Sequence, residues 1–168
     1  MTIAVSALGP QDLSTMEDLN DLFAEVFADP ISFQSRRPRP AYLRALLASD
    51  TFIALVARED GHLVGGLAAY ELKKFEQERS EIYIYDLAVR ASHRRRGVAT
   101  ALIEALRELA AARGAWVVFV QADTAPEDAP AIALYTKLGR REDVLHFDIE
   151  VGDRQNPDQR AAPPAKKD

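Results

Sequence analysis

Apolar residues that recur every three or four positions mark the expected helices of this chain. The clearest run covers residues 13–27 and predicts an amphipathic helix that stops before Pro30. A second run over residues 98–109 forms one helical face, and Gly114 is placed to end that helix. Two shorter helices complete the set, over residues 42–47 and 130–139.

The expected strands are short runs that are rich in β-branched and aromatic residues or apolar throughout. Asp60-Gly61 separates two of them and predicts a hairpin. The run at residues 115–121 is continuously apolar, as expected of a strand buried on both faces. Residues 31–40 contain two prolines and are expected to form a loop. The strands are expected at residues 2–8, 51–59, 62–72, 80–89, 115–121 and 142–151.

The order of these elements is β-α-α-β-β-β-α-β-α-β, which predicts an α/β fold with helices on the faces of a mixed sheet. We expect residues 1–151 to form a single domain. Residues 152–168 are polar and proline-rich, and we expect them to be disordered.

Composition excludes several classes of site. The chain has no cysteine, which rules out disulfides, a thiol nucleophile and a cysteine zinc site. Its histidines, at positions 62, 93 and 146, do not have helical ligand spacing, so we expect no metal. The net charge of −5 disfavours nucleic acid and raises the prospect of a cationic partner.

The pattern along the chain also bears on location. The first residues lack the basic and apolar segments of a signal peptide. No apolar run approaches the roughly 20 residues that span a bilayer. We therefore expect a cytoplasmic protein that does not associate with membranes.

The most distinctive polar feature is RRRGVA, which joins an expected strand to an expected helix. We call residues 94–97 the arginine turn. The first amides of a helix have no internal partner and favour anions. A glycine at position 97 lets the backbone approach a phosphate, and the arginines offer charge-assisted hydrogen bonds. These residues alone leave two interpretations open, a solvated surface turn and a cradle for a phosphorylated cofactor.

RRRGVA also resembles the R/Q-x-x-G-x-G/A signature of the GNAT acetyltransferase superfamily, with Arg94 first, Gly97 in the middle and Ala99 last. DLAV before it and ALYTKLG after it occupy the family's expected places. The segments FEQERSEIYIYDLAV, HRRRGVATALI, VQAD and ALYTKLGRREDVLHFDI are similar to the aminoglycoside 3-N-acetyltransferase branch, the gentamicin and fortimicin resistance type. The likeness runs from about residue 5 to residue 150 and is densest from Phe75 to Ile149.

The resemblance implies a mostly antiparallel sheet and transfer of an acetyl group from acetyl-coenzyme A (acetyl-CoA) to the 3-amino group of an aminoglycoside. One strand end would bind the pantetheine arm through its backbone, and the arginine turn with the start of the next helix would bind the pyrophosphate. The residues so implied are Leu87, Ala88 and Val89 for the arm, and Arg94, Arg95, Arg96, Gly97, Val98, Ala99 and Thr100 for the pyrophosphate.

Amine acetylation needs a proton acceptor, because an ammonium group cannot attack the acetyl carbon. Asp86 interrupts an apolar strand immediately before the pantetheine segment and is our candidate base; the alternative is a structural aspartate. Glu81 is a second candidate for that role, or a solvent-facing residue. Tyr135 matches the family tyrosine that can protonate the leaving thiolate, although it can equally serve packing.

A polycationic substrate predicts an acidic pocket. The candidate substrate-binding residues lie along or at the ends of expected strands, and they are Tyr85, Asp123, Glu142, Asp143, His146 and Asp148. We also expect a homodimer, because the family often dimerises through its sheet edge or last strands.

Three other functions remain open. The first is acetylation of another amine, such as a polyamine, an amino acid or a protein N-terminus. The second is a non-catalytic module that binds acetyl-CoA as a regulatory ligand. The third is nucleic-acid binding through the three arginines, which the negative net charge disfavours.

Overall fold

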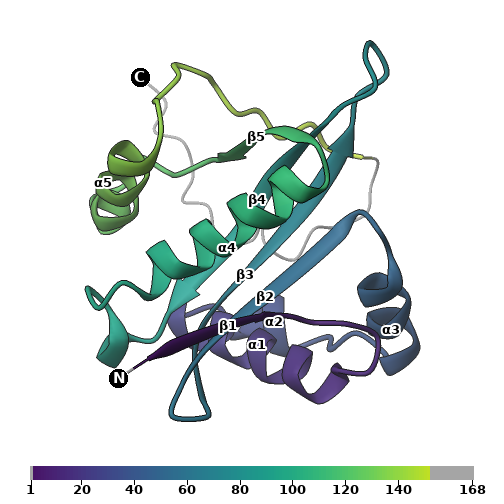
Figure 1. Ribbon diagram of the computed structural model, residues 1–168. Coiled ribbons are helices and arrows are strands. Elements are labelled where there is room, and N and C mark those ends of the chain that lie inside the picture. Colours follow the sequence, from purple (N-terminus) through teal and green to yellow (C-terminus); the bar gives the residue numbers. More distant parts are fainter. Residues whose placement is uncertain (1, 152–168) are drawn as a thin grey trace.

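Five strands form one sheet in the order β1-β2-β3-β4-β5 in the computed structural model of the protein, which describes residues 2–151 (Figure 1). Strands β1 to β4 are antiparallel to their neighbours, whereas β5 runs parallel to β4. The expected mixed, mostly antiparallel sheet is therefore confirmed. The strands are β1 (Ile3–Ala7), β2 (Phe52–Glu59), β3 (His62–Lys73), β4 (Ser80–Val89) and β5 (Ala115–Val120).

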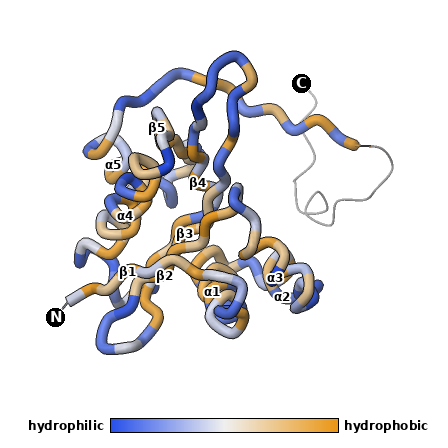
Figure 2. The backbone as a smooth tube through the Cα atoms, turned by 45° about the vertical axis from the view of Figure 1, so that its right-hand side comes forward, coloured by the Kyte–Doolittle hydropathy of each residue, from blue (hydrophilic) through white to orange (hydrophobic). Residues whose placement is uncertain are grey.

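Helices cover both faces of this sheet. One face carries α1 and α3, and the other carries α4 (Figure 1). Each face has its own apolar cluster, which appears as orange stretches of the tube where helices meet the sheet (Figure 2). The helices are α1 (Leu13–Val26), α2 (Pro30–Gln34), α3 (Pro40–Ala48), α4 (Val98–Ala112) and α5 (Ala129–Leu138), with short 3-10 turns η1 (Ala91–His93) and η2 (Pro126–Asp128).

The helical spacing predicted for α1 and α4 places their apolar residues in these clusters. Leu19, Leu22 and Phe23 of α1 are fully buried on one face, and Leu102 and Leu106 of α4 are fully buried on the other. Burial of each such side chain contributes about 1.5–3 kcal/mol. The two helices are thereby anchored to opposite sides of β3 and β4.

The predicted hairpin at Asp60-Gly61 is confirmed. Both residues have a positive φ, 51° and 82°, and the strands resume at once with Glu59 opposite His62. This is the conformation of a two-residue type I′ turn, whose twist matches that of the strands. The turn fixes the end of β2 and, with it, the position of Glu59.

The expected loop at residues 31–40 contains a short helix instead. Pro30 occupies the first turn of α2, where its missing N–H costs nothing, and the Asp29 carboxylate accepts a hydrogen bond from the Ser32 amide at 3.0 Å. The proline that suggests the end of one helix also begins the next.

Two expectations about the last third of the chain are wrong. Strand β5 is an edge strand, with Trp116 69% exposed, so it is not buried on both faces. Residues 142–151, the C-terminal segment, form no strand, because no backbone within residues 2–151 pairs with them. The segment's apolar side chains are exposed, and they are Val144, Leu145, Phe147, Ile149 and Val151.

Residues 152–168, for which we predicted disorder, lie outside the described residues. Within residues 2–151, no helix has the length and apolar character needed to cross a bilayer.

Candidate active site

Strands β4 and β5 separate part-way along their length. Their last paired residues are Ile84 and Val120, where β5 ends. Strand β4 continues to Val89, and no described strand pairs with Tyr85–Val89 on the β5 side. An unpaired strand edge presents backbone N–H and C=O groups that an extended ligand can use. The expected pantetheine-binding residues, Leu87, Ala88 and Val89, all lie on this open edge.

A β-bulge lies at the same place. Ile84 is opposite Ala69 of β3 and Asp86 is opposite Ala68, so Tyr85 is an extra residue in β4. Strict alternation would put Asp86 on the α4 face together with Ile84. The extra residue moves Asp86 to the face of Ala68, which packs in the α1–α3 cluster. The bulge thus brings Asp86 to the same face as Tyr83.

Asp86 is partly buried, and this burial raises the pKa of its carboxyl group to about 6. The carboxylate is close enough to influence the phenols of Tyr70 and Tyr83, whose pKa values are raised chiefly by burial and further by the Asp86 charge. A carboxyl group with a pKa near 6 is ionised at neutral pH, yet it holds a proton more strongly than an ordinary aspartate. These are the properties of a general base.

Aromatic side chains line this face in an unbroken series, which we call the aromatic row. Its neighbours lie 4.9–5.8 Å apart between ring centroids. Tyr70, Tyr83 and Tyr85 border an open cavity of about 590 Å³. Of these three, only Tyr85 belongs to the substrate-binding set expected above; the alternating tyrosines of IYIY are the signal that identifies Tyr83. The row consists of Phe52, Tyr70, Tyr85, Tyr83 and Phe119.

A hydrogen-bonded chain links the C-terminal segment to this row. The Tyr83 hydroxyl donates to Gln121 Oε1 at 2.9 Å, and His146 Nδ1 lies 3.1 Å from the same oxygen. His146 Nε2 is in turn 3.0 Å from Asp148 Oδ1. Two of the expected substrate residues, His146 and Asp148, are therefore connected to the aromatic row. Gln121 belongs to the VQAD segment, but only the fold shows that it lies between Tyr83 and His146.

The remaining acidic candidates lie elsewhere. Glu142 pairs with Arg140 at 2.9 Å, and Asp143 lies 3.9 Å from Arg141, all on exposed chain. Asp123 is exposed in the loop that follows β5. None of the three contacts the aromatic row through a hydrogen bond or ion pair among those found in residues 2–151.

The arginine turn has the backbone of an anion site. Gly97 precedes α4 with a φ of 85°, and no described side chain caps the helix. A Cβ added at Gly97 would meet no described heavy atom within 4 Å, so the space in front of the turn is open. Arg94 and Arg95 are exposed beside it, and Val98, Ala99 and Thr100 supply the first amides of the helix. These residues fit a pyrophosphate group.

Tyr135 lies on α5 and packs against the apolar cluster of the α4 face. Burial, with a smaller contribution from the Asp128 charge, raises the pKa of its phenol. Tyr135 therefore keeps its proton at neutral pH and is available as a donor. Both expected uses of this residue, packing and proton donation, are compatible with its position.

Glu81 lies near the start of β4, where it accepts a hydrogen bond from Arg79 at 2.9 Å. Glu81 lies several residues before the bulge along β4, and its carboxylate is paired with Arg79 there. As for metals, nowhere in residues 2–151 do three or more His, Cys, Asp or Glu side chains gather as ion ligands.

The sequence profile of the Acetyltransferase (GNAT) family matches residues 16–139, which include the bulge, the open edge and the arginine turn. The chain belongs to the GNAT acetyltransferase family. Enzymes of this family use acetyl-CoA as the acetyl donor, so the GNAT fold accounts for an open edge that leads to an anion site.

Several solved structures of acetyltransferases resemble this chain over most of its length. An aminoglycoside acetyltransferase from an uncultured soil metagenomic sample is 66% identical, with a TM-score of 0.89 over 90% of this chain and 100% of its own. A second such enzyme from soil, in complex with sisomicin, is 31% identical, with a TM-score of 0.81 over 89% and 96%. A ribosomal-protein-alanine N-acetyltransferase from Brucella melitensis biovar Abortus 2308 is 26% identical, with a TM-score of 0.69 over 90% and 100%. Among curated proteins, none matches significantly.

Proposed function

We propose that this GNAT acetyltransferase acetylates the 3-amino group of gentamicin-type aminoglycosides. The observation that carries the proposal is the bulge in β4, which turns the partly buried Asp86 towards the aromatic row at the point where β4 loses its β5 neighbour. The 66% identical relative supports the substrate class, as does the 31% identical relative in complex with sisomicin.

The donor would lie along β4. Backbone groups of Leu87, Ala88 and Val89 would hold the pantetheine arm on the open edge, and the arginine turn with the first amides of α4 would hold the pyrophosphate. Acetyl-CoA supplies an acetyl group activated as a thioester.

The chain's own residues would then manage protons and charge. Asp86 accepts a proton from the substrate ammonium, which frees the nitrogen to form a bond with the acetyl carbon as the carbon–sulfur bond breaks. A backbone N–H of the open edge donates to the carbonyl oxygen and stabilises its developing charge. The Tyr135 hydroxyl donates a proton to the departing sulfur, and the second proton that the nitrogen loses as the amide forms restores the phenol.

The acceptor site would combine aromatic and acidic groups. Tyr83 and Tyr85 offer flat, partly exposed surfaces beside the Asp86 carboxylate. His146 and Asp148 are joined to Tyr83 through Gln121. Together with a net charge of −5, this surface attracts a polycation and repels an anion. Asp123, Glu142 and Asp143 would act at longer range, from the rim.

We also propose that the protein is a homodimer. The C-terminal segment alternates exposed apolar residues with polar ones, as in a strand with one face to bury. Residues 152–168 contain no large apolar side chain that could cover this face. A second copy would contribute the same C-terminal segment and the same unpaired outer edge of β5. The two copies would then cover each other's apolar segment and strand edge at once.

Acetylation of a different amine is the competing function, and the 26% identical ribosomal-protein-alanine N-acetyltransferase favours it. The deciding experiment is thiol release from acetyl-CoA with gentamicin, fortimicin, kanamycin and spermidine as acceptors, followed by NMR of the product. Turnover of gentamicin with the acetyl group on the 3-amino nitrogen supports the proposal. Turnover of spermidine alone, or of none of the four with the coenzyme still bound, would overturn it in favour of another amine or a binding module.

A further inference from the structure

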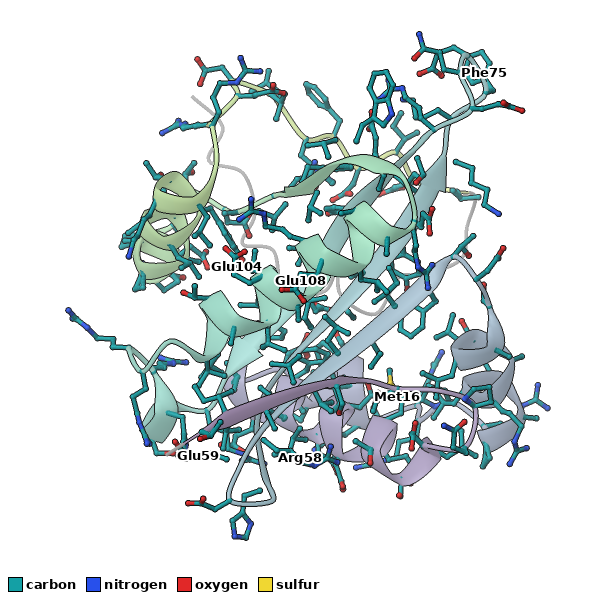
Figure 3. All side chains as sticks on the ribbon, in the orientation of Figure 1. Met16, Arg58, Glu59, Phe75, Glu104 and Glu108 are labelled. Carbon is teal, nitrogen blue, oxygen red and sulfur yellow. The ribbon has the colours of Figure 1, made fainter. Side chains whose placement is uncertain are left out.

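Two buried glutamates hold the two ends of α4. Glu59, the last residue of β2, is 9% exposed and accepts a hydrogen bond from Arg96 at 2.8 Å, just before the helix begins. Glu71 of β3 is also 9% exposed and accepts one from Arg113 at 2.8 Å, just after the helix ends. Figure 3 shows Glu59 at the end of the sheet from which the chain enters α4.

Glu59 has a second partner in the same segment. Its other carboxylate oxygen lies 3.3 Å from His93 Nε2, in the 3-10 turn that follows β4. One buried carboxylate therefore contacts His93, immediately before the arginine turn, and Arg96, within it. The type I′ turn at Asp60-Gly61 fixes the backbone of Glu59 at the end of β2.

The arginine turn needs such support because its backbone is unfavourable. Arg95 has a φ of 60°, a conformation that costs a residue with a Cβ about 1 kcal/mol or more, and Gly97 follows at 85°. A strained turn persists only where its surroundings hold it. Charge-assisted hydrogen bonds to a buried carboxylate are among the stronger contacts available for this purpose.

We propose that Glu59 is a positioning residue for the coenzyme site: it holds the arginine turn in the shape that receives the pyrophosphate, and Arg96 serves this contact and not the coenzyme. The inference rests on the proposed use of acetyl-CoA. It assigns different tasks to the three exposed arginines, because Arg96 donates to the Glu59 carboxylate, whereas Arg94 donates to the neutral Val89 carbonyl at 3.4 Å and keeps its charge for the phosphates.

The direction in which coenzyme A affinity changes on substitution of Glu59 separates a positioning role from a purely electrostatic one. Replacing Glu59 by glutamine removes a negative charge from beside an anion site, which by charge alone would tighten coenzyme binding. Loss of the turn's support would weaken it. We expect E59Q to bind coenzyme A about tenfold more weakly, in line with the loss of a charged hydrogen bond.

The test is calorimetric titration of the full chain with coenzyme A, with E71Q as a matched control. Glu71 has the same burial and the same arginine contact at the other end of α4, so E71Q loosens the helix without touching the turn. We expect E71Q to bind the coenzyme like the wild type. In turnover assays, E59Q should raise KM for acetyl-CoA and leave kcat at saturation within about twofold.

Arg96 provides a second variant in case E59Q does not fold. Its side chain is 40% exposed, so the protein should tolerate its replacement. R96Q should weaken binding about as much as E59Q, and the double variant should be no weaker than the worse single one. Equal or tighter binding by E59Q, equal weakening by E71Q, or additive losses in the double variant would each overturn the positioning role. A wild type that binds no coenzyme A would instead overturn the proposed function itself.

Discussion

Asp86 of β4 lies opposite Ala68 of β3. Ile84, two residues before Asp86, lies opposite Ala69, which directly follows Ala68 in the chain. The single extra residue between them decides which face of the sheet the carboxylate occupies. Without it, Asp86 would face α4; with it, Asp86 faces the aromatic row. The site thus depends on strand register as much as on residue identity.

Replacing Asp86 by asparagine should remove the base with little change of shape. We expect kcat/KM to fall by roughly 10²–10⁴. Because the pKa of Asp86 is raised to about 6, wild-type kcat/KM should fall tenfold per pH unit below that value, and the D86N profile should lack this limb. In D86N, which lacks this proton acceptor, activity should instead rise at higher pH as the free substrate amine appears. Parallel profiles for the two proteins would remove Asp86 from the proton transfer.

The same substitution should make the protein more stable. The folded-state pKa of Asp86 is about 6, above its unfolded value, so the folded state binds this proton more tightly. Ionisation then costs stability, and the cost grows from about pH 4 to pH 6 and stays constant above. After allowance for partial exposure, we expect D86N to gain about 1–2 kcal/mol in the free energy of unfolding at pH 7.5 and little at pH 4. Urea titrations at the two pH values measure this, and a D86N protein less stable at pH 7.5 would contradict it.

Gly97 and Gly114 flank α4 and form a natural pair for substitution. Both have a positive φ, 85° and 75°, and neither has a described heavy atom within 4 Å of an added Cβ. Replacement of either by alanine should cost about 1–2 kcal/mol of unfolding free energy, from backbone strain. Only G97A should also weaken coenzyme A binding, by about tenfold or more, because its methyl group enters the space in front of the turn. Equal coenzyme affinities in the two variants would show that the phosphates do not approach Gly97.

Tyr135→Phe removes the hydroxyl and keeps the ring that packs against the α4 face. If the hydroxyl protonates the departing sulfur, kcat should fall by about tenfold. This is a smaller loss than general acid catalysis usually causes, because a thiol leaves readily. Thermal stability and KM for acetyl-CoA should stay near the wild-type values. An unchanged kcat would leave Tyr135 a packing residue.

The proposed dimer can be tested through the C-terminal segment. Phe147 is 76% exposed, so an F147D variant should fold normally yet lose the apolar surface that the second copy would cover. We expect sedimentation equilibrium to give a dimer for the wild type and a monomer for F147D. Glu150→Lys, a charge change on a polar position of the same segment, is the control and should remain dimeric. A monomeric wild type would contradict the proposal.

Local chemistry explains which elements the sequence predicts well. The helical spacing of α1 and α4, the Asp60-Gly61 turn and the glycine at position 114 each act within a few residues, and all are confirmed. The element order then suffices for the sheet class. The family signature and the arginine turn predict the proposed anion site on the same local grounds.

The expectations that are wrong, or that the sequence cannot supply, depend on neighbours far along the chain. The apolar composition of β5 suggests burial, but the exposure of its side chains depends on which distant segments pack on each face of the sheet. The alternation at residues 142–151 suggests a strand, but a strand needs a pairing partner. The bulge at Tyr85 has no local signal, and so the full aromatic row and the position of Gln121 between Tyr83 and His146 become visible only once the fold is known.

Trp116 is the only tryptophan of the chain, and it stands exposed on the edge strand with the Arg79 guanidinium 4.7 Å from its ring centroid. In a folded monomer this side chain should emit as in water, so unfolding of a monomer should shift the emission only slightly, and circular dichroism is the better signal for the stability experiments. If a second copy covers the β5 edge, Trp116 leaves water and its emission should move to shorter wavelength. The protein therefore carries an intrinsic reporter that responds to association and is nearly silent to denaturation of a monomer such as the F147D variant.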